Sequence, residues 1–370
     1  MLAAAPELPA NMRVTGLRGV GKTVLLEEFQ ESARASGWEA AFLELQPSMN
    51  TDQAIREALC DLLRRTRASI SRLQRIRGGA ASKLSGVKLA VRWEELALSV
   101  SFGSRRERDL ARELYETLAV AQRHRRAGVV LLLDEAQLVR DERDRHGEHP
   151  LSLLLAPAIA LQRAALPLAL VLCGLPTLTA NLQRARSYAE RLFRGEEITS
   201  LDPADALAAF AKPLVGSGRQ TERRVAQLVV EEVEGYPCFI QLWGAELWDA
   251  AERAGRKRFS AKLLEAIRPE IYERLDSDFY KPRLWTLTPA EQDLLIASAR
   301  CSYPPLRTVE LAETSSKSRG NINVLLGRLV DAGALYRVRK GEYDYSAPRF
   351  RDFLLRLTRA TDAAQEARGR

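Results

Sequence analysis

The first part of the chain alternates short apolar segments with longer segments in which apolar residues recur at helical spacing. The apolar segments of strand length lie at 11–15, 38–45, 129–133 and 168–173. Continuous apolar runs are typical of strands that are buried on both faces, and strands that alternate with helices indicate a parallel sheet. The pattern therefore predicts an α/β domain over residues 1–202.

Helical periodicity between these strands predicts helices at 22–36, 52–77, 106–125 and 150–164. Pro157 predicts a kink or break in the last of them, because proline removes a helical hydrogen bond. The stretch 86–102 alternates apolar and polar residues, which predicts a two-stranded hairpin or a pair of edge strands. It lies in a basic segment of about residues 60–105 that we expect to be an insertion in the domain.

From Pro203 to Arg274 the pattern is that of helices alone. Asp202 followed by Pro203 is a helix start, with a capping residue and a proline in the first turn. A second helix is predicted over 221–234, and a third begins after Pro237. We expect residues 203–284 to form a helical lid.

Residues 285–360 have a third pattern. Thr288 and Glu291 have the spacing of a capping box, which marks the start of a helix. Helices are predicted at 289–299, 306–313 and 318–332, and strands at 335–338 and 343–346. Three helices followed by a basic β-hairpin are typical of a winged helix-turn-helix. The polar residues 361–370 are expected to form a flexible tail.

The chain is basic, with a net charge of +8 and a pI of about 9.4. A basic chain favours anionic partners, and nucleic acid is the first to consider. The alternative is that arginine simply occupies many neutral surface positions, as in the proteins of a GC-rich genome.

Cysteine usage and hydropathy restrict the location of the protein. The cysteines are far apart in the sequence, at Cys60, Cys173, Cys238 and Cys301. This spacing offers no zinc framework and fits a reducing cytosol. The N-terminus lacks the features of a signal peptide, and the longest apolar run, 153–175, is interrupted by two prolines and an arginine. We therefore expect a soluble, cytoplasmic protein without a membrane partner.

A phosphate-binding loop lies between the first strand and the first helix. Residues 16–23 read GLRGVGKT, which is the complete Walker A spacing. Its glycines allow backbone N–H groups to surround phosphates, while Lys22 reaches the β- and γ-phosphates and the Thr23 hydroxyl is placed to bind Mg²⁺. The candidate nucleotide-binding residues here are Gly16, Gly19, Val20, Gly21, Lys22, Thr23 and Val24.

A Walker B motif is the second, independent signal. The apolar strand 129–133 ends in Asp134 and Glu135, at the edge of the sheet where the phosphate-binding loop also lies. Asp134 is the candidate metal ligand together with Thr23. Glu135 is the candidate base that polarises the attacking water. The alternative for Glu135 is an acidic residue that only stabilises a helix N-terminus.

These motifs together resemble the AAA+/STAND division of P-loop ATPases, whose sheet is of the ASCE type. The resemblance is carried by GLRGVGKT, by LLLDEAQ at 131–137, by CGLPTL at 173–178, by GYP at 235–237 and by the winged helix. It extends over nearly the whole chain, and the nearest relatives are bacterial and archaeal ATPases similar to origin-recognition initiators. The resemblance implies that the chain binds ATP and Mg²⁺ and hydrolyses ATP, at a rate that can be slow.

The resemblance also implies further site residues. A polar sensor residue usually ends the strand after Walker B, and here that position holds the weakly polar pair Cys173 and Gly174. An arginine finger would be Arg191, with Arg194 as the second choice, and it implies self-association; the alternative is an ordinary surface arginine. Pro237 corresponds to the segment against the adenine and ribose, or else to a plain helix start. No Gly-Arg box of the adenine pocket precedes the loop, so the resemblance specifies the phosphate contacts better than the base contacts.

Two basic regions are candidates for contact with double-stranded DNA. The residues of the winged helix that we single out are Lys317, Arg319 and Asn321 on the recognition helix, and Arg337, Arg339 and Lys340 with Tyr343 and Tyr345 on the wing. The alternative is a winged helix that contacts protein or packs on the ATPase core. The arginine-rich run 64–77 is either a second DNA contact or a solvated helix face. His146 and His149 have a spacing suited to a metal, but a loop is the better interpretation.

The sequence thus leads to two functional hypotheses. In the first, the chain is an ATPase that binds DNA through its winged helix and acts as an initiator, a loader or an accessory factor of a mobile element or defence system. In the second, it is a nucleotide-switched regulatory ATPase whose winged helix contacts a protein, such as one encoded nearby.

Overall fold

The computed structural model describes residues 11–76, 93, 104–141, 148–185, 189–315 and 317–368. These residues form two compact units. The first unit contains the described residues up to Gly16 and those of Lys22–Ile198. The second contains Leu17–Gly21 and the described residues from Thr199 onwards.

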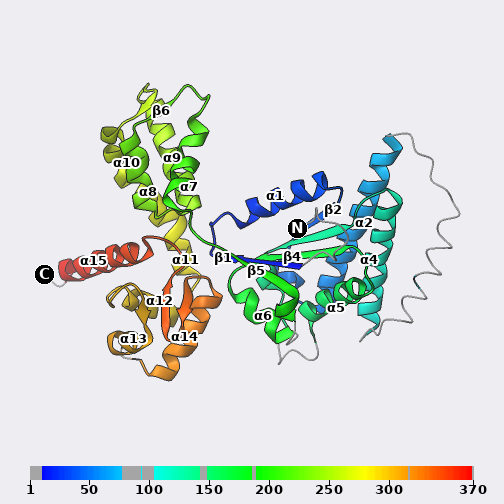
Figure 1. The fold of residues 1–370 in the computed structure, drawn as a ribbon. Helices are drawn as coiled ribbons and strands as arrows, with labels where there is room; N and C mark the ends of the chain where they lie inside the picture. Colours follow the sequence, from blue (N-terminus) through cyan, green and yellow to red (C-terminus); the bar gives the residue numbers. More distant parts are fainter. Residues whose placement is uncertain are drawn as a thin grey trace. The chain divides into compact units, whose positions relative to one another are not determined.

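A five-stranded parallel sheet is the centre of the first unit (Figure 1). Its strands, in spatial order, are β2 (Glu39–Glu44), β3 (Val129–Asp134), β4 (Leu168–Gly174), β1 (Asn11–Gly16) and β5 (Phe193–Ile198). The four strands that the apolar runs predict are confirmed. The sequence did not predict β5, because this edge strand reads FRGEEI, of which only Phe193 is buried, and it lacks a continuous apolar run.

The order of the strands brings the two Walker motifs to the same edge of the sheet. β4 lies between β1 and β3, with Met12 opposite Val171 on one side and Leu133 opposite Leu172 on the other. The carboxyl ends of parallel strands meet at one edge of a sheet, which is where ligands bind in open α/β folds. The end of β1, which leads into the Walker A loop, therefore lies on one side of the end of β4. Asp134, at the end of β3, lies on the other side.

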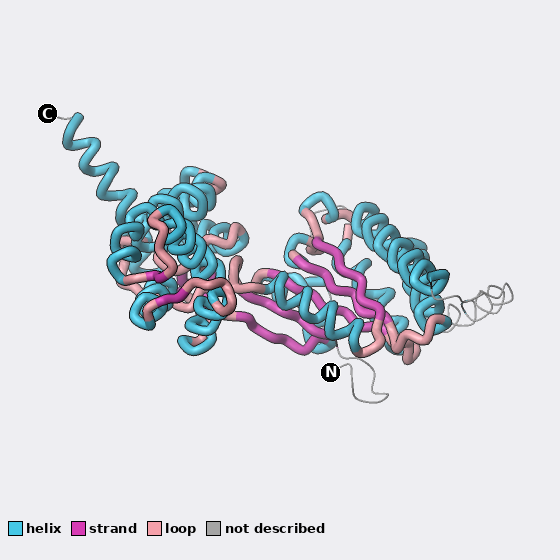
Figure 2. Tube along the Cα trace, turned by 90° about the horizontal axis from the view of Figure 1, so that it is seen from above, coloured by secondary structure: helices cyan, strands magenta, loops and turns pink. Residues whose placement is uncertain are grey.

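Helices cover the two faces of this sheet unequally (Figures 1 and 2). One face packs against α2 (Asp52–Ile76), α4 (Arg105–Arg123), α5 (Pro150–Arg163) and α6 (Thr177–Ala185). Among the described residues, α1 (Lys22–Ala35) is the only helix in the apolar cluster on the other face. Connections between parallel strands are right-handed, so the direction of each connection across the sheet decides which face its helix covers. The connection from β1 to β2 runs in one direction across the sheet, and those from β2 to β3, β3 to β4 and β4 to β5 run in the other. Pro157 lies inside α5 without ending it, so of the expected kink or break the break is absent.

The expected hairpin at 86–102 lies outside the described residues, apart from Trp93. This residue is helical and buried, and its ring packs against that of Tyr115 at a centroid distance of 5.4 Å. One positive charge of the arginine-rich run 64–77 is offset within the first unit, because Arg67 on α2 forms an ion pair with Glu113 on α4 at 2.6 Å.

The second unit begins with the expected helices and one unexpected small sheet. The helices are α7 (Pro203–Ala211), α8 (Arg223–Val233), α9 (Pro237–Arg253) and α10 (Ala261–Arg274). Asp202 caps α7 as predicted, since its side chain accepts a hydrogen bond from the Asp205 N–H at 2.8 Å. The region is not helical throughout, because the two-residue strands β6 (Gln220–Thr221) and β7 (Arg258–Phe259) pair in parallel.

The rest of the second unit combines helices with a three-stranded sheet. After a π-helical turn at Leu275–Tyr280, the order is α11 (Lys281–Trp285), α12 (Pro289–Ser298), β8 (Leu306–Arg307), α13 (Thr308–Ser315), α14 (Arg319–Asp331), β9 (Leu335–Arg339), β10 (Glu342–Tyr345) and α15 (Phe350–Arg368). The sheet has the order β8-β10-β9. The predicted capping box of α12 is present, with the Thr288 N–H donating to Glu291 at 2.8 Å.

One expectation for this region needs correction. The segment predicted as a helix at 306–313 starts with a strand, since Leu306 and Arg307 pair with β10. Helix α15 extends to Arg368, into the segment 361–370 whose flexibility stays a prediction. Aromatic packing also links the expected lid to the C-terminal region, because the ring of Tyr280 stacks on Phe353 and Phe350, at centroid distances of 5.1 and 5.4 Å. The boundary at 284/285 therefore stays a prediction.

Candidate nucleotide-binding site

The Walker A residues form a turn that ends at the N-terminus of α1. Gly19 and Gly21 have φ angles of +81° and +94°, a region that glycine reaches at no steric cost. Lys22 is the first residue of α1 and is buried. A helix N-terminus preceded by a glycine turn presents free N–H groups and a positive dipole to an anion. The local backbone therefore suits the binding of phosphate.

The candidate metal ligands contact each other in the first unit. The Thr23 hydroxyl on α1 donates to Oδ2 of Asp134, the last residue of β3, at 2.7 Å. The other carboxylate oxygen of Asp134 accepts the N–H of Glu135 at 2.8 Å, and the residue is only 2% exposed. A hydroxyl and a carboxylate are the hard oxygen donors that Mg²⁺ prefers. The chemistry of this pair fits an Mg²⁺ ion held together with nucleotide phosphates.

Glu135 follows Asp134 in a conformation unusual for its residue type. Its φ and ψ angles are 53° and 33°, in the left-handed region where a residue other than glycine is uncommon and strained. Oε2 of its side chain accepts a hydrogen bond from Nε2 of Gln137, two residues later, at 2.5 Å. Sequence patterns did not single out Gln137, although it is the last letter of the DEAQ motif, because its role depends on contacts across the sheet.

The sensor position at the end of β4 holds a neutral group. Cys173 is fully buried. Its burial, and next the nearby Asp134 carboxylate, raises the pKa of its thiol to about 12. The thiol therefore stays protonated at neutral pH. It is a weak hydrogen-bond donor beside the carboxylate, and the stronger polar side chain at this end of β4 is that of Gln137, whose Oε1 accepts the Leu175 N–H at 2.9 Å.

Within the second unit, the segment Gly235–Cys238 contacts the Walker A residues Leu17–Gly21. The Tyr236 hydroxyl donates to the Arg18 carbonyl, and the Cys238 N–H donates to the Gly19 carbonyl at 3.3 Å. Tyr236 is 2% exposed, and this burial raises the pKa of its hydroxyl. The sequence singled out Pro237, the first residue of α9, as the candidate contact with the nucleotide. The residues that touch the loop are its two neighbours.

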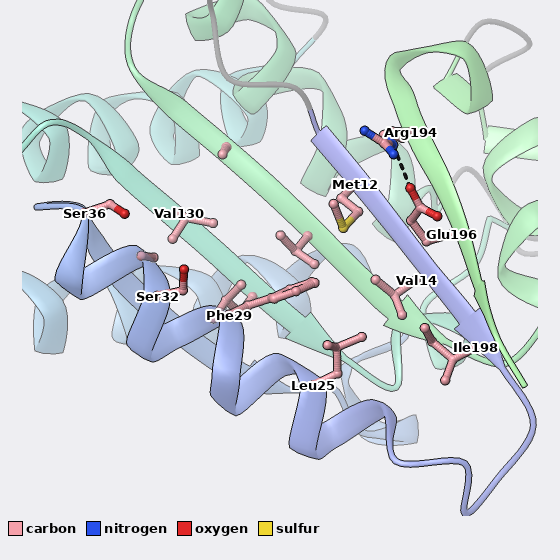
Figure 3. Close-up of a pocket in the computed structure, with 14 residues that line it drawn as sticks. Met12, Val14, Leu25, Phe29, Ser32, Ser36, Val130, Arg194, Glu196 and Ile198 are labelled. Atoms are coloured by element: carbon pink, nitrogen blue, oxygen red, sulfur yellow. Dashed lines mark hydrogen bonds and ion pairs between the residues drawn. The ribbon is translucent and has the colours of Figure 1, made fainter. Parts of the chain in front are cut away.

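The two candidates for an arginine finger have different surroundings. Arg191 is exposed in the turn Ala189–Leu192, directly before β5. Arg194 pairs with Glu196 of the same strand at 2.6 Å. Both residues of this pair line a mostly apolar cavity of about 530 Å³ between α1 and the sheet (Figure 3), and none of the candidate nucleotide-binding or metal-binding residues lines it.

The candidate DNA contacts are mostly exposed. Arg319, Asn321, Arg337, Arg339 and Lys340 are exposed, and Lys317 is partly buried. The charge of Arg339 is offset by an ion pair with Glu342 at 2.5 Å.

The tyrosines expected on the wing are not free for contact. Tyr343 is 8% exposed and Tyr345 is 4% exposed. The hydroxyl of Tyr345 lies 2.8 Å from that of Ser298. Both are buried residues rather than sugar or phosphate contacts, and Tyr345 contacts α12 through Ser298.

Other site types find no support in the part of the chain that the structure describes. It contains no group of three or more His, Cys, Asp or Glu side chains that could hold a metal. It also contains no helix that is long and apolar enough to cross a membrane.

Comparisons with known proteins identify the first part of the chain. The model of the AAA domain family matches residues 9–182. The sequence of this part of the chain is therefore similar to that of AAA domains. This confirms the family resemblance that the Walker motifs carry. Residues 277–354 match a domain of unknown function (DUF8462), and no curated protein matches the chain.

Solved structures extend the likeness of the AAA domain to the fold of nearly the whole chain. A Walker-type ATPase of Pyrococcus abyssi is 17% identical, with a TM-score of 0.55, over 93% of this chain and 90% of that one. The ORC2 protein of Aeropyrum pernix, in complexes with ADPNP and ADP, is 13% identical, with a TM-score of 0.56, over 97% of this chain and 90% of that one. The fold is therefore that of a P-loop NTPase with a helical C-terminal region.

Proposed function

We propose that the chain is an AAA+ ATPase that binds ATP with Mg²⁺ and hydrolyses it. The observation that carries this proposal is the 2.7 Å contact between Thr23 and Asp134. It joins the first turn of the helix after the Walker A loop to the end of the Walker B strand, which are distant in sequence. A chance match to either motif would not bring two hard oxygen donors together at the end of a phosphate-binding loop.

Each residue has a distinct part in the proposed reaction. The N–H groups of the loop and the ammonium of Lys22 bind the phosphates. Thr23 and Asp134 would hold Mg²⁺, which neutralises charge on the phosphates when bound. Glu135 accepts a hydrogen bond from the attacking water and orients it toward the γ-phosphate. Arg191 of a second copy completes the site, so we expect self-association on nucleotide binding.

Adenine is the base that we expect, with Pro237 and its neighbours in contact with the nucleotide. The likeness to the Aeropyrum pernix protein, which was solved in adenine-nucleotide complexes, supports this choice. The contacts of Tyr236 and Cys238 with the loop support a link between nucleotide binding and the second unit.

We further propose that residues 285–360 are a winged helix that binds double-stranded DNA. The order α12-β8-α13-α14-β9-β10 supports this assignment, with α14 as the recognition helix and β9-β10 as the wing. Arg319 and Asn321 lie in the first turn of α14, and Ser318 caps that helix. The protein would then act as an initiator, a loader or an accessory factor of a mobile element or defence system.

Filter binding of a labelled DNA duplex tests this function directly. The expected result is binding at low salt that changes when ATP and Mg²⁺ are added. Binding should weaken steeply as the salt concentration rises, because cationic side chains release counterions from DNA. Absence of binding at low salt, with and without ATP, would contradict the DNA-binding part. A parallel assay of released phosphate tests the ATPase part alone.

One observation favours a second candidate function, in which the winged helix contacts a protein. Val324 on α14 and Val338 on β9 are 55% and 50% exposed, and apolar groups suit a protein interface better than a phosphate backbone. A regulatory ATPase of this kind would retain its nucleotide, hydrolyse it slowly and show no DNA affinity in the same filter assay.

A further inference from the structure

Gln137 connects two parts of the site that the Walker motifs do not connect. Its Nε2 donates to Oε2 of Glu135 at 2.5 Å, and its Oε1 accepts the backbone N–H of Leu175 at 2.9 Å. Glu135 follows β3, whereas Leu175 follows β4. A single buried amide thus joins the candidate base to the end of the neighbouring strand.

The orientation of this amide is determined by its partners. Oxygen and nitrogen of a glutamine amide look alike, so the assignment depends on the groups around them. The backbone N–H of Leu175 can only donate, so Oε1 must face it. Nε2 therefore points toward Glu135, whose carboxyl oxygen Oε2 accepts its hydrogen bond. The two contacts require the same orientation of the amide. The reversed orientation would place Nε2 against the Leu175 N–H, two donors, and Oε1 against the Glu135 carboxylate, two acceptors.

The surroundings leave Gln137 little freedom to move. Its side chain is 8% exposed, and its backbone carbonyl accepts a hydrogen bond from the Asn181 side chain at 3.0 Å. A Cβ atom on Gly174 would overlap with Oε1 of Gln137. The absence of a side chain at position 174 is therefore what gives the amide its place against β4.

Glu135 has no comparable restraint of its own. It is only partly buried, and a glutamate side chain has several rotatable bonds that a general base must hold in one geometry. The bond from Gln137 engages Oε2 and leaves Oε1 as the oxygen for the water. A strained left-handed backbone at Glu135 also persists only where its surroundings hold it.

We propose that Gln137 is the positioning residue of the ATPase reaction, and that it sets the carboxylate of Glu135 from the end of β4. This inference rests on the proposed hydrolysis of ATP. Gln137 fills the place of the polar sensor that the sequence of β4 lacks, since Cys173 and Gly174 at its end offer no strong polar group. It touches neither the nucleotide nor the metal in this assignment and acts through Glu135.

Two single variants and their combination test the proposal in the full-length protein. Gln137→Ala removes the amide. Gly174→Ala, at a residue distant in the sequence, adds a methyl group that displaces the amide. Each should lower kcat for ATP by about 10-fold to 100-fold, part of what a positioned base contributes. Neither should change KM or the affinity for a non-hydrolysable ATP analogue. In the double variant the shortened side chain at position 137 removes the overlap with Oε1. The new methyl group then meets only the backbone N of residue 137, at 3.2 Å, and that of Ala136, at 3.4 Å, which small shifts relieve, so kcat should be close to that of Gln137→Ala.

A matched control separates positioning from a general loss of structure. Gln162 is also a hydrogen-bonded glutamine of the first unit, and its Nε2 donates to the Leu168 carbonyl at 2.8 Å and to Asn11 at 2.7 Å. Gln162→Ala should lower the melting temperature at least as much as Gln137→Ala and leave kcat unchanged.

Amide hydrogen exchange in the nucleotide-free protein supplies a readout that does not depend on activity. The Leu175 amide should exchange faster in Gln137→Ala than in the wild type or in Gln162→Ala, because it loses its acceptor.

Three results would overturn the inference. They are a wild-type kcat in Gln137→Ala, an equal loss of kcat and nucleotide affinity, or additive effects in the double variant. A wild type that binds ATP without hydrolysing it contradicts the proposed function and the role of Gln137 together. A wild type that hydrolyses ATP as fast as Gln137→Ala contradicts the inference alone.

Discussion

The two candidate functional regions of this protein are built in different ways. At the end of the sheet, Asp134 and Gln137 are buried, and hydrogen bonds fix their side-chain atoms. On α14 and β9, residues such as Arg319 and Arg337 are exposed. The first region has the preorganisation that a chemical step requires. The second has charge at the surface, which suffices for binding a polyanion.

This difference predicts how each region responds to substitution. A site that depends on fixed geometry should lose most of its activity through one residue. A site that depends on charge should lose affinity in small steps, with strong dependence on salt. Four sets of substitutions test this comparison, from the largest expected effect to the smallest.

Glu135→Gln should have the largest effect. The amide cannot accept the proton or polarise water as the carboxylate does, so kcat for ATP hydrolysis should fall by about 1000-fold, as for the loss of a general base. Nucleotide affinity should be retained. Phosphate release under saturating ATP measures the first quantity and titration calorimetry the second. Glu44→Gln at the end of β2 is the control, and a similar loss there would contradict a specific role of Glu135.

Lys22→Ala should come next. Loss of the ammonium removes a charge-assisted contact with the phosphates, and ATP affinity should fall by about 100-fold. Binding of a fluorescent ATP analogue measures the change. Lys212→Ala, which changes an exposed lysine in the second unit, serves as the comparison. Unchanged affinity in Lys22→Ala would mean that the loop does not bind phosphate.

Combined Arg319→Ala and Arg337→Ala should weaken DNA binding by about 10-fold at moderate salt. If both side chains contact phosphates, the slope of log K against log salt should decrease by about 2, or roughly 1 for each contact. Filter binding at several salt concentrations supplies both values. Arg224→Ala on α8, also exposed, is the control. An unchanged slope would favour the protein-binding alternative for the winged helix.

Tyr236→Phe should have the smallest effect. The ring stays in its cluster with Phe239, at a centroid distance of 4.9 Å, and only the hydrogen bond to the Arg18 carbonyl is lost. The free energy of unfolding should fall by about 1 kcal/mol. Denaturant titration measures this change.

Tyr272→Phe is the control for this variant, because its hydroxyl bonds to Glu232 and not to the loop. Both variants should lose stability. Only Tyr236→Phe should also weaken ATP binding, by a few-fold. Equal ATP affinity in the two would contradict a link between Tyr236 and the phosphate-binding loop.

The sequence predicted those parts of the structure that local signals determine. The glycines of the Walker A loop, the apolar strand before Asp134 and the capping box at Thr288 each depend on residues close in the chain. The fold class and the placement of the Walker residues follow from such signals.

What the sequence could not predict depends on contacts between distant residues. Gln137 matters because Leu175 lies opposite it, and Tyr345 of the β9-β10 hairpin is buried at a contact with Ser298 of α12. Strand β5 lacks an apolar run because it lies at the edge of the sheet. Neither spacing nor periodicity records which segments become neighbours in the fold.

The unequal covering of the sheet has a consequence for hydration. Helix α1 carries Lys22 and Thr23 at its first turn and packs beside an open pocket lined by Leu25 and Phe29. Apolar side chains that line an open pocket keep part of their surface in contact with water, and burial of that surface is favourable. Larger apolar side chains at the pocket can therefore stabilise the helix that carries the phosphate-binding residues without altering either Walker motif.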